Sequence, residues 1–308
     1  MGWGRGYYAL QAAGGALWWL AVAVSPAVRD ATLGSLDPVV VAVLDLPLFV
    51  VASALAAAGL RLAAWVAAGW TLVVSVALAV YATITTEAGW GVLAMGPAAV
   101  ASVAALCLVT TGRVPTRWIV SGPFAFRPAV PRAGSTANLA STLAQIVVFW
   151  GFFLAVVPLV LRFLESRWGL DVAWPLAPPV GLALLVLASA LGLWAGFTMS
   201  VIGRGTPLPA AMPNRLVVAG PYRFIRNPMA VAGFVQGSAV GFVMSSWFVV
   251  GYGILGAVLW NYAIRPHEEG DLERRFGAPY RRYRDAVRCW IPGRPVAASV
   301  PMAGTTDG

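Results

Sequence analysis

The chain has 308 residues, of which 59% are hydrophobic and only 11% are charged. This composition lies outside the range of ordinary water-soluble domains and places the protein in a lipid bilayer. The formal net charge of +9 arises from arginine alone, since the sequence contains no lysine. The arginines fall in alternating loops, so membrane topology and anionic lipid headgroups explain the charge, and we expect membrane lipids and no nucleic acid as partners.

Apolar stretches long enough to cross about 30 Å of hydrocarbon as helices recur along the chain. We predict these spans: Tyr8–Val24, Val39–Leu60, Leu62–Thr83, Val92–Thr111, Leu139–Leu161, Val180–Ile202, Met229–Val243 and Trp247–Ile264. The last two are separated by a few residues only, which predicts a helical hairpin that enters and leaves the bilayer on one side. The predicted fold class is all-α, a polytopic integral membrane helix bundle with about eight transmembrane helices.

Arginines mark one side of this arrangement. They are Arg5, Arg61, Arg113, Arg117, Arg127, Arg132, Arg204, Arg215, Arg223 and Arg226. The opposite loops carry mixed charge, as at Asp30 and Glu165. Because cytoplasmic loops are enriched in basic residues, we expect an integral cell-membrane protein whose active site faces the cytoplasm.

The first four spans form an N-terminal membrane region, residues 1–137, of unknown role. Its tryptophans lie near the predicted helix ends and are most simply interfacial anchors: Trp18, Trp19, Trp65, Trp70 and Trp90. Asp45 is different, because it lies inside the second span beside Pro47. An ionisable group at that depth indicates function. The alternative is a kinked helix whose carboxyl binds a hydroxyl group or a water molecule.

A loop rich in proline, glycine and arginine, Gly112–Thr136, separates this region from the rest. Within it, Arg117–Pro128 resembles the later Arg215–Pro228, but no acidic cluster follows the first copy, so we favour chance or a decayed duplication. The predicted organisation is residues 1–137 as the N-terminal region, 138–294 as the core and 295–308 as a disordered tail.

The loop from Gly203 to Pro228 is longer than a connection between neighbouring helices requires, which suggests a role of its own. Its glycines, including Gly220, permit close approach of a ligand to the backbone, and its prolines fix the path of the chain. Such a loop could wrap a small polar molecule. Arg223 and Arg226 would share one face if the segment turns helically.

Acidic side chains follow the hairpin directly, in Arg265–Leu272. Because the hairpin returns to its starting surface, Glu268 and Glu269 should lie beside Asn227 and Pro228 and could balance a cationic ligand. The alternative is a solvated helix start whose acids favour the helix dipole and nothing more. Spacing alone does not separate the two interpretations.

The residues beyond form an amphipathic, interfacial helix with a break at Gly277–Pro279. Its apolar face carries Leu272, Phe276, Tyr280, Tyr283 and Val287. We expect this helix to lie over the site, with its tyrosines as packing residues.

The succession GRGTPLP, LVVAGPYRFIRNPM, HEEGDLERRFGAPYRRYRDAV and RCWIP, from about Gly203 to Pro292, resembles the C-terminal core of the isoprenylcysteine carboxyl methyltransferase family and its phospholipid methyltransferase relatives. The resemblance is specific because several motifs occur in order around a two-helix hairpin. It departs from the family pattern at Asn227, Ala230 and Gly270, where histidine, tyrosine and proline are frequent.

The resemblance implies a membrane methyltransferase that holds S-adenosylmethionine between the loop before the hairpin and the glutamates after it. It implies Arg226, Glu268 and Glu269 as catalytic residues, with Arg226 near the acceptor carboxylate. The donor-binding residues are then Gly220, Tyr222, Ile225, Asn227, Pro228, His267, Glu268 and Glu269. No metal is expected, since a single histidine cannot build a zinc site.

Methyl transfer from a sulfonium requires mainly alignment of donor and acceptor. We expect a lipophilic acceptor, such as the carboxylate of an isoprenoid-like molecule or a lipid, that enters from the bilayer. An amine acceptor would need a base, for which His267 or a glutamate is the nearest candidate.

Two alternatives remain. An NADPH-dependent membrane reductase of related fold could hold a 2′-phosphate with the arginine-rich loop, although the acidic pair would repel it. A transporter or non-catalytic scaffold is supported by the front four spans and Asp45.

Overall fold

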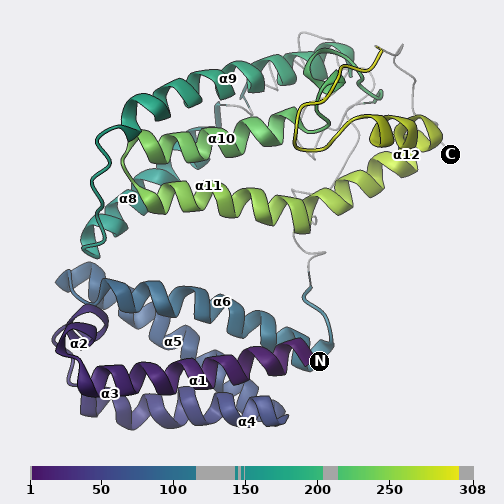
Figure 1. The fold of residues 1–308 in the computed structure, drawn as a ribbon. Helices are drawn as coiled ribbons and strands as arrows, with labels where there is room; N and C mark the ends of the chain where they lie inside the picture. The colour runs from purple at the N-terminus through teal and green to yellow at the C-terminus, as the bar shows by residue number, and fades with distance from the viewer. Residues whose placement is uncertain (1, 116–142, 145–146, 149, 204–213, 298–308) are drawn as a thin grey trace. The chain divides into compact units, whose positions relative to one another are not determined.

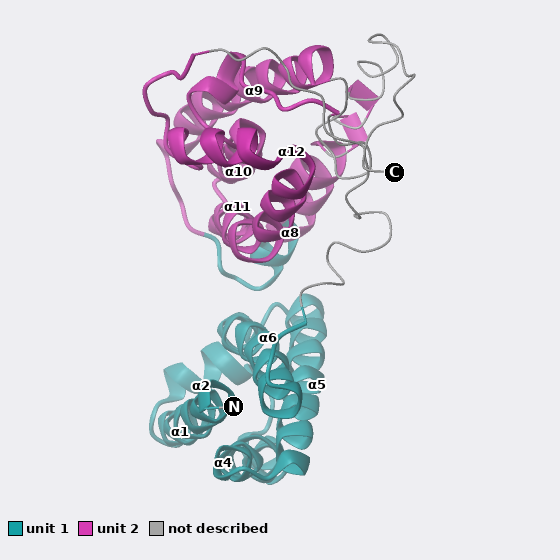
Figure 2. Ribbon diagram, turned by 90° about the vertical axis from the view of Figure 1, so that its right-hand side faces the viewer, with its two compact units in different colours: residues 1–115, 163–171 teal, residues 116–162, 172–308 magenta. Residues whose placement is uncertain are grey.

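The computed structural model describes residues 2–115, 143–144, 147–148, 150–203 and 214–297, and this part of the chain folds into helices joined by loops (Figure 1). The chain forms two compact units (Figure 2). Unit 1 comprises residues 1–115 and 163–171, and unit 2 comprises residues 116–162 and 172–308. The predicted domain boundary at 137/138 lies outside the described residues.

Helices long and apolar enough to cross a bilayer confirm the predicted class, a polytopic helical membrane protein. Among the described residues there are 6 of them: Gly2–Val24, Pro38–Ala58, Arg61–Thr85, Gly89–Thr111, Ala177–Ile202 and Trp247–Ala286. The predicted span Met229–Val243 forms a shorter apolar helix, Pro228–Val243. The predicted span Leu139–Leu161 lies partly outside the described residues.

Unit 1 is built from α1 (Gly2–Val24), α2 (Pro26–Leu33), α3 (Pro38–Asp45), the π-helix η1 (Leu46–Val51), α4 (Ala52–Ala58), α5 (Arg61–Thr85) and α6 (Gly89–Thr111). Proline at the first position and a polar cap start two of these helices. The side chains of Ser25 and Asp37 accept hydrogen bonds from the first backbone N–H groups of α2 and α3. Helix α1 packs against both α4 and α6, and α5 packs along α6.

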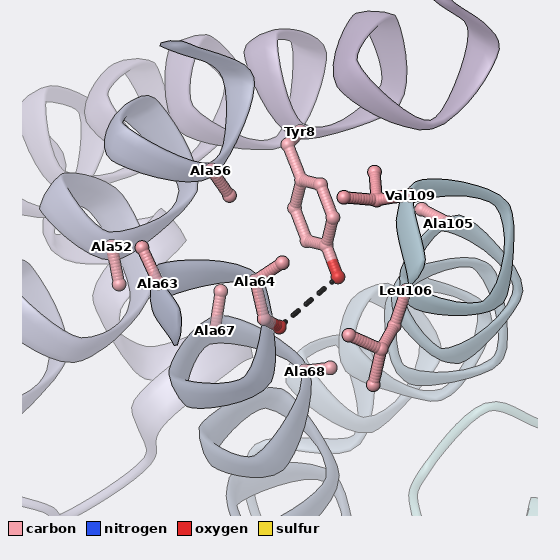
Figure 3. Close-up of a cluster of buried hydrophobic side chains, with 10 residues drawn as sticks. All are labelled: Tyr8, Ala52, Ala56, Ala63, Ala64, Ala67, Ala68, Ala105, Leu106 and Val109. Atoms are coloured by element: carbon pink, nitrogen blue, oxygen red, sulfur yellow. Dashed lines mark hydrogen bonds between the residues drawn. The ribbon is translucent and has the colours of Figure 1, made fainter. Parts of the chain in front are cut away.

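Small side chains bring the helices of unit 1 together around Tyr8, which is fully buried (Figure 3). The Tyr8 hydroxyl donates to the carbonyl oxygen of Ala64 at 3.2 Å and lies 3.0 Å from that of Ser102. Alanines of α4, α5 and α6 surround the ring. Close approach through small residues is the usual way in which helices associate in a bilayer, where lipid is as apolar as the protein core.

A polar network one turn further along α1 adds hydrogen bonds between helices. Gln11 donates from Nε2 to Ser53 at 3.1 Å and to Thr71 at 3.2 Å, and its Oε1 accepts from Ser102 at 2.6 Å. All four side chains are buried. Such networks link transmembrane helices because their polar groups find no partner in lipid.

Unit 2 contains η4 (Gly151–Val156), α9 (Ala177–Ile202), the 3-10 turn η6 (Gly220–Arg223), α10 (Pro228–Val243), α11 (Trp247–Leu259), η7 (Trp260–Ile264) and α12 (Arg265–Ala286). Helix α8 (Val157–Arg167) includes the unit boundary at residue 162. The predicted hairpin is confirmed as α10 and α11, and Ser246 caps the start of α11.

Glycines set the spacing of the helices in unit 2. A Cβ at Gly181 of α9 would stand 2.6 Å from the backbone nitrogen of Val243, and a Cβ at Gly241 of α10 would stand 2.5 Å from that of Val250. Because real Cβ atoms do not approach that closely, these positions require glycine. Helices α9, α10 and α11 are therefore packed backbone against backbone.

The helix after the hairpin, α12, is continuous with the second helix of the hairpin. Helix α11 continues through η7 into α12, since Leu259 and Ile264 at the joins are both helical. The sequence predicts an amphipathic, interfacial helix here, and its helical conformation is confirmed, while its position at the membrane surface stays a prediction. The predicted break is confirmed at Gly277, which has φ 56° and ψ −131° inside α12.

Candidate active site

A cleft in unit 2 is formed where the segment before α10 faces α12. Its polar lining consists of Arg215, Tyr222, Arg226, Asn227, Glu268 and Glu269. Its apolar lining includes Leu216, Leu272 and Phe276. The loop before the hairpin and the acids after it, about 40 residues apart in the sequence, thus share one cavity.

The segment before α10 is fixed against α9 by tight packing. Gly220 has φ 52°, and a Cβ there would stand 2.6 Å from the hydroxyl oxygen of Thr198. The turn η6 follows, with Tyr222 and Ile225 buried. The positive φ and the close contact with Thr198 therefore both require glycine at position 220. Gly220 does not line the cleft, but it sets the turn that places Tyr222 in the cleft wall.

Arg226 is held by three contacts with the C-terminal part of unit 2. Its Nη2 donates to Glu269 at 2.9 Å, its Nη1 donates to the carbonyl oxygen of Arg284 at 2.7 Å, and its backbone nitrogen donates to the carbonyl oxygen of Arg288. The side chains of Arg226 and Glu269 are only 10% and 21% exposed. The Nε of Arg226 is buried without a hydrogen-bond partner in the described part of the chain.

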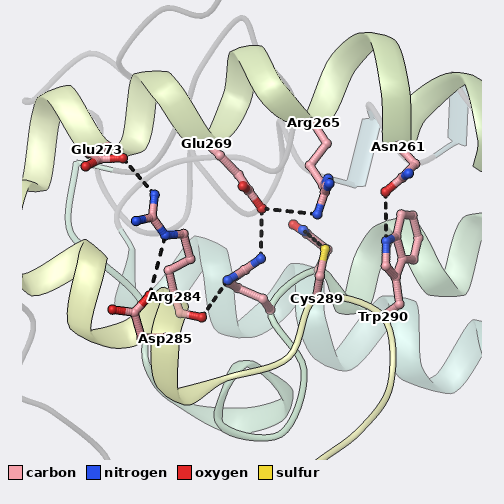
Figure 4. A network of polar contacts seen from close by, with 10 residues as sticks. Asn261, Arg265, Glu269, Glu273, Arg284, Asp285, Cys289 and Trp290 are labelled. Carbon is pink, nitrogen blue, oxygen red and sulfur yellow. Dashed lines mark hydrogen bonds and ion pairs between the residues drawn. The ribbon is translucent and has the colours of Figure 1, made fainter.

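Glu269 is shared by two arginines. In addition to Arg226, Arg265 approaches it to 3.8 Å from one turn earlier on α12 (Figure 4). Farther along, Glu273 accepts from Arg284 at 2.8 Å, which ties α12 to its own continuation after the break. The negative charge of Glu269 is therefore compensated within the protein.

Glu268 differs from its neighbour, because it makes no hydrogen bond or ion pair with any described residue. It lies beyond the apolar stretch that ends at Ile264, in the charged part of α12. Burial, together with the nearby charges of Glu269 and Asp271, raises the pKa of Glu268 to about 7. A carboxyl with this pKa in a cleft is a candidate functional group.

Helix geometry argues against the alternative that these acids merely cap a helix. A capping acid needs free backbone N–H groups at a helix start. Because α11, η7 and α12 are continuous, Glu268 and Glu269 lie well inside a helical run. The capping interpretation is therefore wrong.

Residues after α12 also reach the cleft region. Asn227 donates from its side-chain nitrogen to the Sγ of Cys289 at 3.3 Å, and Trp290 donates from its indole nitrogen to Asn261 at 2.9 Å. Val296 and Arg223 exchange two hydrogen bonds, so part of the predicted tail is fixed to the core. No sequence pattern indicated these contacts, because they join positions far apart in the chain.

The tyrosines of α12 pack as predicted. Phe276, Tyr280, Tyr283 and Val287 form one buried cluster with Leu216 and Val218 of the loop before α10. The Tyr283 hydroxyl donates to the carbonyl oxygen of Tyr222 at 2.9 Å. Burial raises the pKa of Tyr283, which keeps the hydroxyl neutral and able to donate.

The predicted site residues divide into two groups. Tyr222, Arg226, Asn227, Glu268 and Glu269 line the cleft, whereas Gly220, Ile225, Pro228 and His267 do not. Ile225 and Pro228 are buried in the supporting structure. The predicted motif at 204–209 and the repeat-like segment at 117–128 lie outside the described residues, as do residues 298–308 of the predicted tail.

The cleft is narrow. The cavity between its described walls measures about 70 Å³, which is room for the charged end of a small molecule. Among the described residues that line the cleft, the carboxylate of Glu268 and the guanidinium of Arg215 have no hydrogen bond or ion pair, and the buried Nε–H of Arg226 is also without a partner. Groups of opposite charge in one cleft complement a ligand that carries both a cation and an anion.

The fold and this cleft define a class, an integral membrane protein with a polar site beside a helical hairpin. Residues 177–279 match the family model of phospholipid methyltransferases, which covers α9, the hairpin and the acids of α12. The predicted resemblance of the C-terminal core is thereby confirmed. A comparison with curated proteins finds no match to the chain.

Proposed function

We propose that the protein is a membrane methyltransferase that uses S-adenosylmethionine to methylate a lipophilic acceptor. The observation that carries this proposal is the cleft within the family-matched segment, where the carboxylate of Glu268 has no partner among the described residues. An anion without a counter-ion in a partly buried site favours a cationic ligand. S-adenosylmethionine supplies such a cation, together with a transferable methyl group.

In this proposal, the residues of the cleft bind the methyl donor and orient it. Glu268 balances the positive charge of the methyl donor, and the free Nε–H of Arg226 can donate a hydrogen bond to the carboxylate of that ligand. Asn227 adds an amide at the same wall. When bound, S-adenosylmethionine would supply the methyl group to the acceptor and its sulfur would keep the bonding electron pair as a neutral thioether. Glu268 would then lack a counter-charge, which favours release of the product.

Glu269 has a supporting role in this proposal. Its ion pair with Arg226 holds the loop against α12 and leaves Glu268 as the free anion. The role of Arg226 toward an acceptor carboxylate, implied by the family resemblance, is limited, because both terminal nitrogens already donate to protein oxygens. Water exclusion and alignment by such fixed groups can contribute roughly 7–11 kcal/mol to a displacement of this kind.

The acceptor is proposed to be a lipid or an isoprenoid-like molecule that enters from the bilayer, with the cleft on the cytoplasmic side. Arginine-rich loops support this orientation. A carboxylate acceptor is ionised at neutral pH and needs no base, whereas an amine acceptor would need one. His267 does not line the cleft, so Glu268 is the nearer base.

The experiment compares ligand binding by the full chain in lipid nanodiscs. S-adenosylmethionine and S-adenosylhomocysteine should raise the melting temperature, and NADPH should not. Because only S-adenosylmethionine carries the sulfonium charge, Glu268→Gln should weaken its binding about tenfold, with a smaller loss for S-adenosylhomocysteine. Asp285→Asn, a 75% exposed carboxylate near the end of the same helix, is the matched control.

Two results would end the proposal: no response of the wild-type protein to either sulfur compound, or equal binding of both by wild type and Glu268→Gln. Incubation of membranes with methyl-labelled donor, followed by lipid extraction, then identifies the acceptor by the labelled species.

A further inference from the structure

A second cavity lies inside unit 1, apart from the methyltransferase cleft. Its volume is about 480 Å³, within the range of small-molecule sites. Helices α1, α2, α3, α5 and α6 contribute its walls, which are almost entirely aliphatic or aromatic. Nothing in the proposed methyl transfer uses this cavity.

One carboxyl group lines this apolar space. Asp45, at the end of α3, is only 5% exposed. Its Oδ2 accepts from the indole nitrogen of Trp19 and its Oδ1 from that of Trp70, both at 2.8 Å. Its described partners are indole N–H groups and not the hydroxyl group that one sequence-based alternative offered. Trp19 and Trp70 are not simply interfacial anchors, since both indole N–H groups point at this acid.

The charge of Asp45 is not compensated within the described residues. Both donors are neutral, and no described arginine forms a salt bridge with it. A carboxylate offers about four acceptor positions, of which the indoles occupy two. An ionisable group at membrane depth is costly unless paired, and usually marks a ligand or ion site.

The backbone beside Asp45 is also unusual. The π-helix η1 begins at the next residue, Leu46, and includes Pro47. Phe49 from this segment lines the same cavity. Single π-helical turns inside α-helices are frequent at functional sites. Here the altered register places an acid and an aromatic ring on one wall.

The cavity is elongated. On α5 its lining runs from Trp70 to Tyr81, which at the rise of an α-helix is about 16 Å. Asp45 bonds to Trp70 at one end of this run. At the other end the Tyr81 hydroxyl donates to Glu87 at 2.6 Å, in the loop before α6.

We propose that this cavity binds a single-chain lipophilic amine, with its ammonium group against Asp45 and its alkyl chain along α5. The ammonium neutralises the acid and donates to its free acceptor positions, and the chain occupies the apolar walls. A fatty carboxylate would be repelled by Asp45, and a fatty alcohol would leave its charge uncompensated. This inference does not depend on the proposed methyltransferase activity.

The test is photo-crosslinking of the full chain in nanodiscs with three probes that share one alkyl chain carrying a diazirine. They differ only in the head, which is an amine, an alcohol or a carboxylic acid. The amine should label peptides from α1, α3 and α6 about tenfold more than the other two. Asp45→Asn should reduce amine labelling to the level of the alcohol.

A second variant keeps the test decisive if Asp45→Asn folds poorly. Gly14 of α1 lines the cavity, and a Cβ there would meet nothing within 4 Å, so Gly14→Phe fills the space from one wall. It should abolish amine labelling of these peptides. Gly6→Phe, on the same helix with equally open surroundings but outside the cavity, should not. Equal labelling by all three probes, or undiminished labelling in Gly14→Phe, would overturn the proposal.

Discussion

Arg226 donates to Glu269 across 43 positions of the chain, at 2.9 Å. This pair joins the segment before the hairpin to the helix after it, and closes the loop that contains α10 and α11. Because Glu269 is committed to Arg226, the two adjacent glutamates are not equivalent. Of these two glutamates, Glu268 is the one that has no hydrogen bond or ion pair with a described residue and is available to a ligand.

Glu269→Gln should destabilise the protein by about 2–3 kcal/mol, because a mostly buried guanidinium then loses its counter-charge. Arg226→Met should cost a similar amount. The double variant Arg226→Met with Glu269→Gln should cost less than the sum of the two, since neither charge is left alone. Thermal unfolding in nanodiscs measures all three. Strictly additive losses would show that the pair contributes nothing of its own.

Glycine at position 241 should be required by helix packing. A Cβ there would stand 2.5 Å from the backbone nitrogen of Val250, so Gly241→Ala must push α10 and α11 apart, at about 1–3 kcal/mol. Gly233→Ala on the same helix is the control, because a Cβ there meets nothing within 4 Å. It should be neutral or stabilising by up to about 1 kcal/mol. Similar melting temperatures for the two variants would contradict the close hairpin.

Gly277 separates the two parts of α12 with a backbone conformation that side chains avoid, φ 56° and ψ −131°. Gly277→Ala should therefore cost about 1–3 kcal/mol although a Cβ there meets no neighbour. The strain should also displace Tyr280 and Tyr283 from the cleft wall and weaken donor binding. Gly270→Ala, earlier on the same helix, should raise the melting temperature. If Gly270→Ala lowered the melting temperature and Gly277→Ala raised it, α12 would be straight in solution.

Much of the fold could be predicted because it follows from local patterns. The length of the apolar stretches predicted the spans, the short polar connection predicted the α10–α11 hairpin, and Gly277–Pro279 predicted the break. Continuity of α11 with α12 was missed, because the charges after Ile264 suggest a new element, while the backbone remains helical through η7.

The residues that line the candidate cleft could be predicted in part from the sequence, but the contacts among them could not. The convergence of Asn227 with Glu268 follows from a hairpin returning to its starting surface. That Glu269 binds Arg226, and that Asn227 reaches Cys289, depends on side-chain directions in folded space. The same holds for Asp45, whose indole partners come from two other helices.

The pKa of Glu268 predicts opposite effects of pH on stability and on donor binding. Burial raises this pKa from its ordinary 4.5 to about 7 in the folded protein. An acid of this kind favours the folded state when protonated, so its contribution is complete below about pH 4.5 and is lost as the pH rises through 7. The melting temperature of the ligand-free protein should fall between pH 5 and pH 8.

Donor binding should change in the other direction, because a cation binds the ionised form of Glu268. Affinity for S-adenosylmethionine should rise as the pH passes through 7, by up to about tenfold per pH unit below the pKa. Glu268→Gln should flatten both profiles, while Asp285→Asn should leave them as in wild type. If the donor affinity of Glu268→Gln still rises with pH between pH 5 and pH 8 as in wild type, another group titrates. Glu268 is then not the anion that binds the donor.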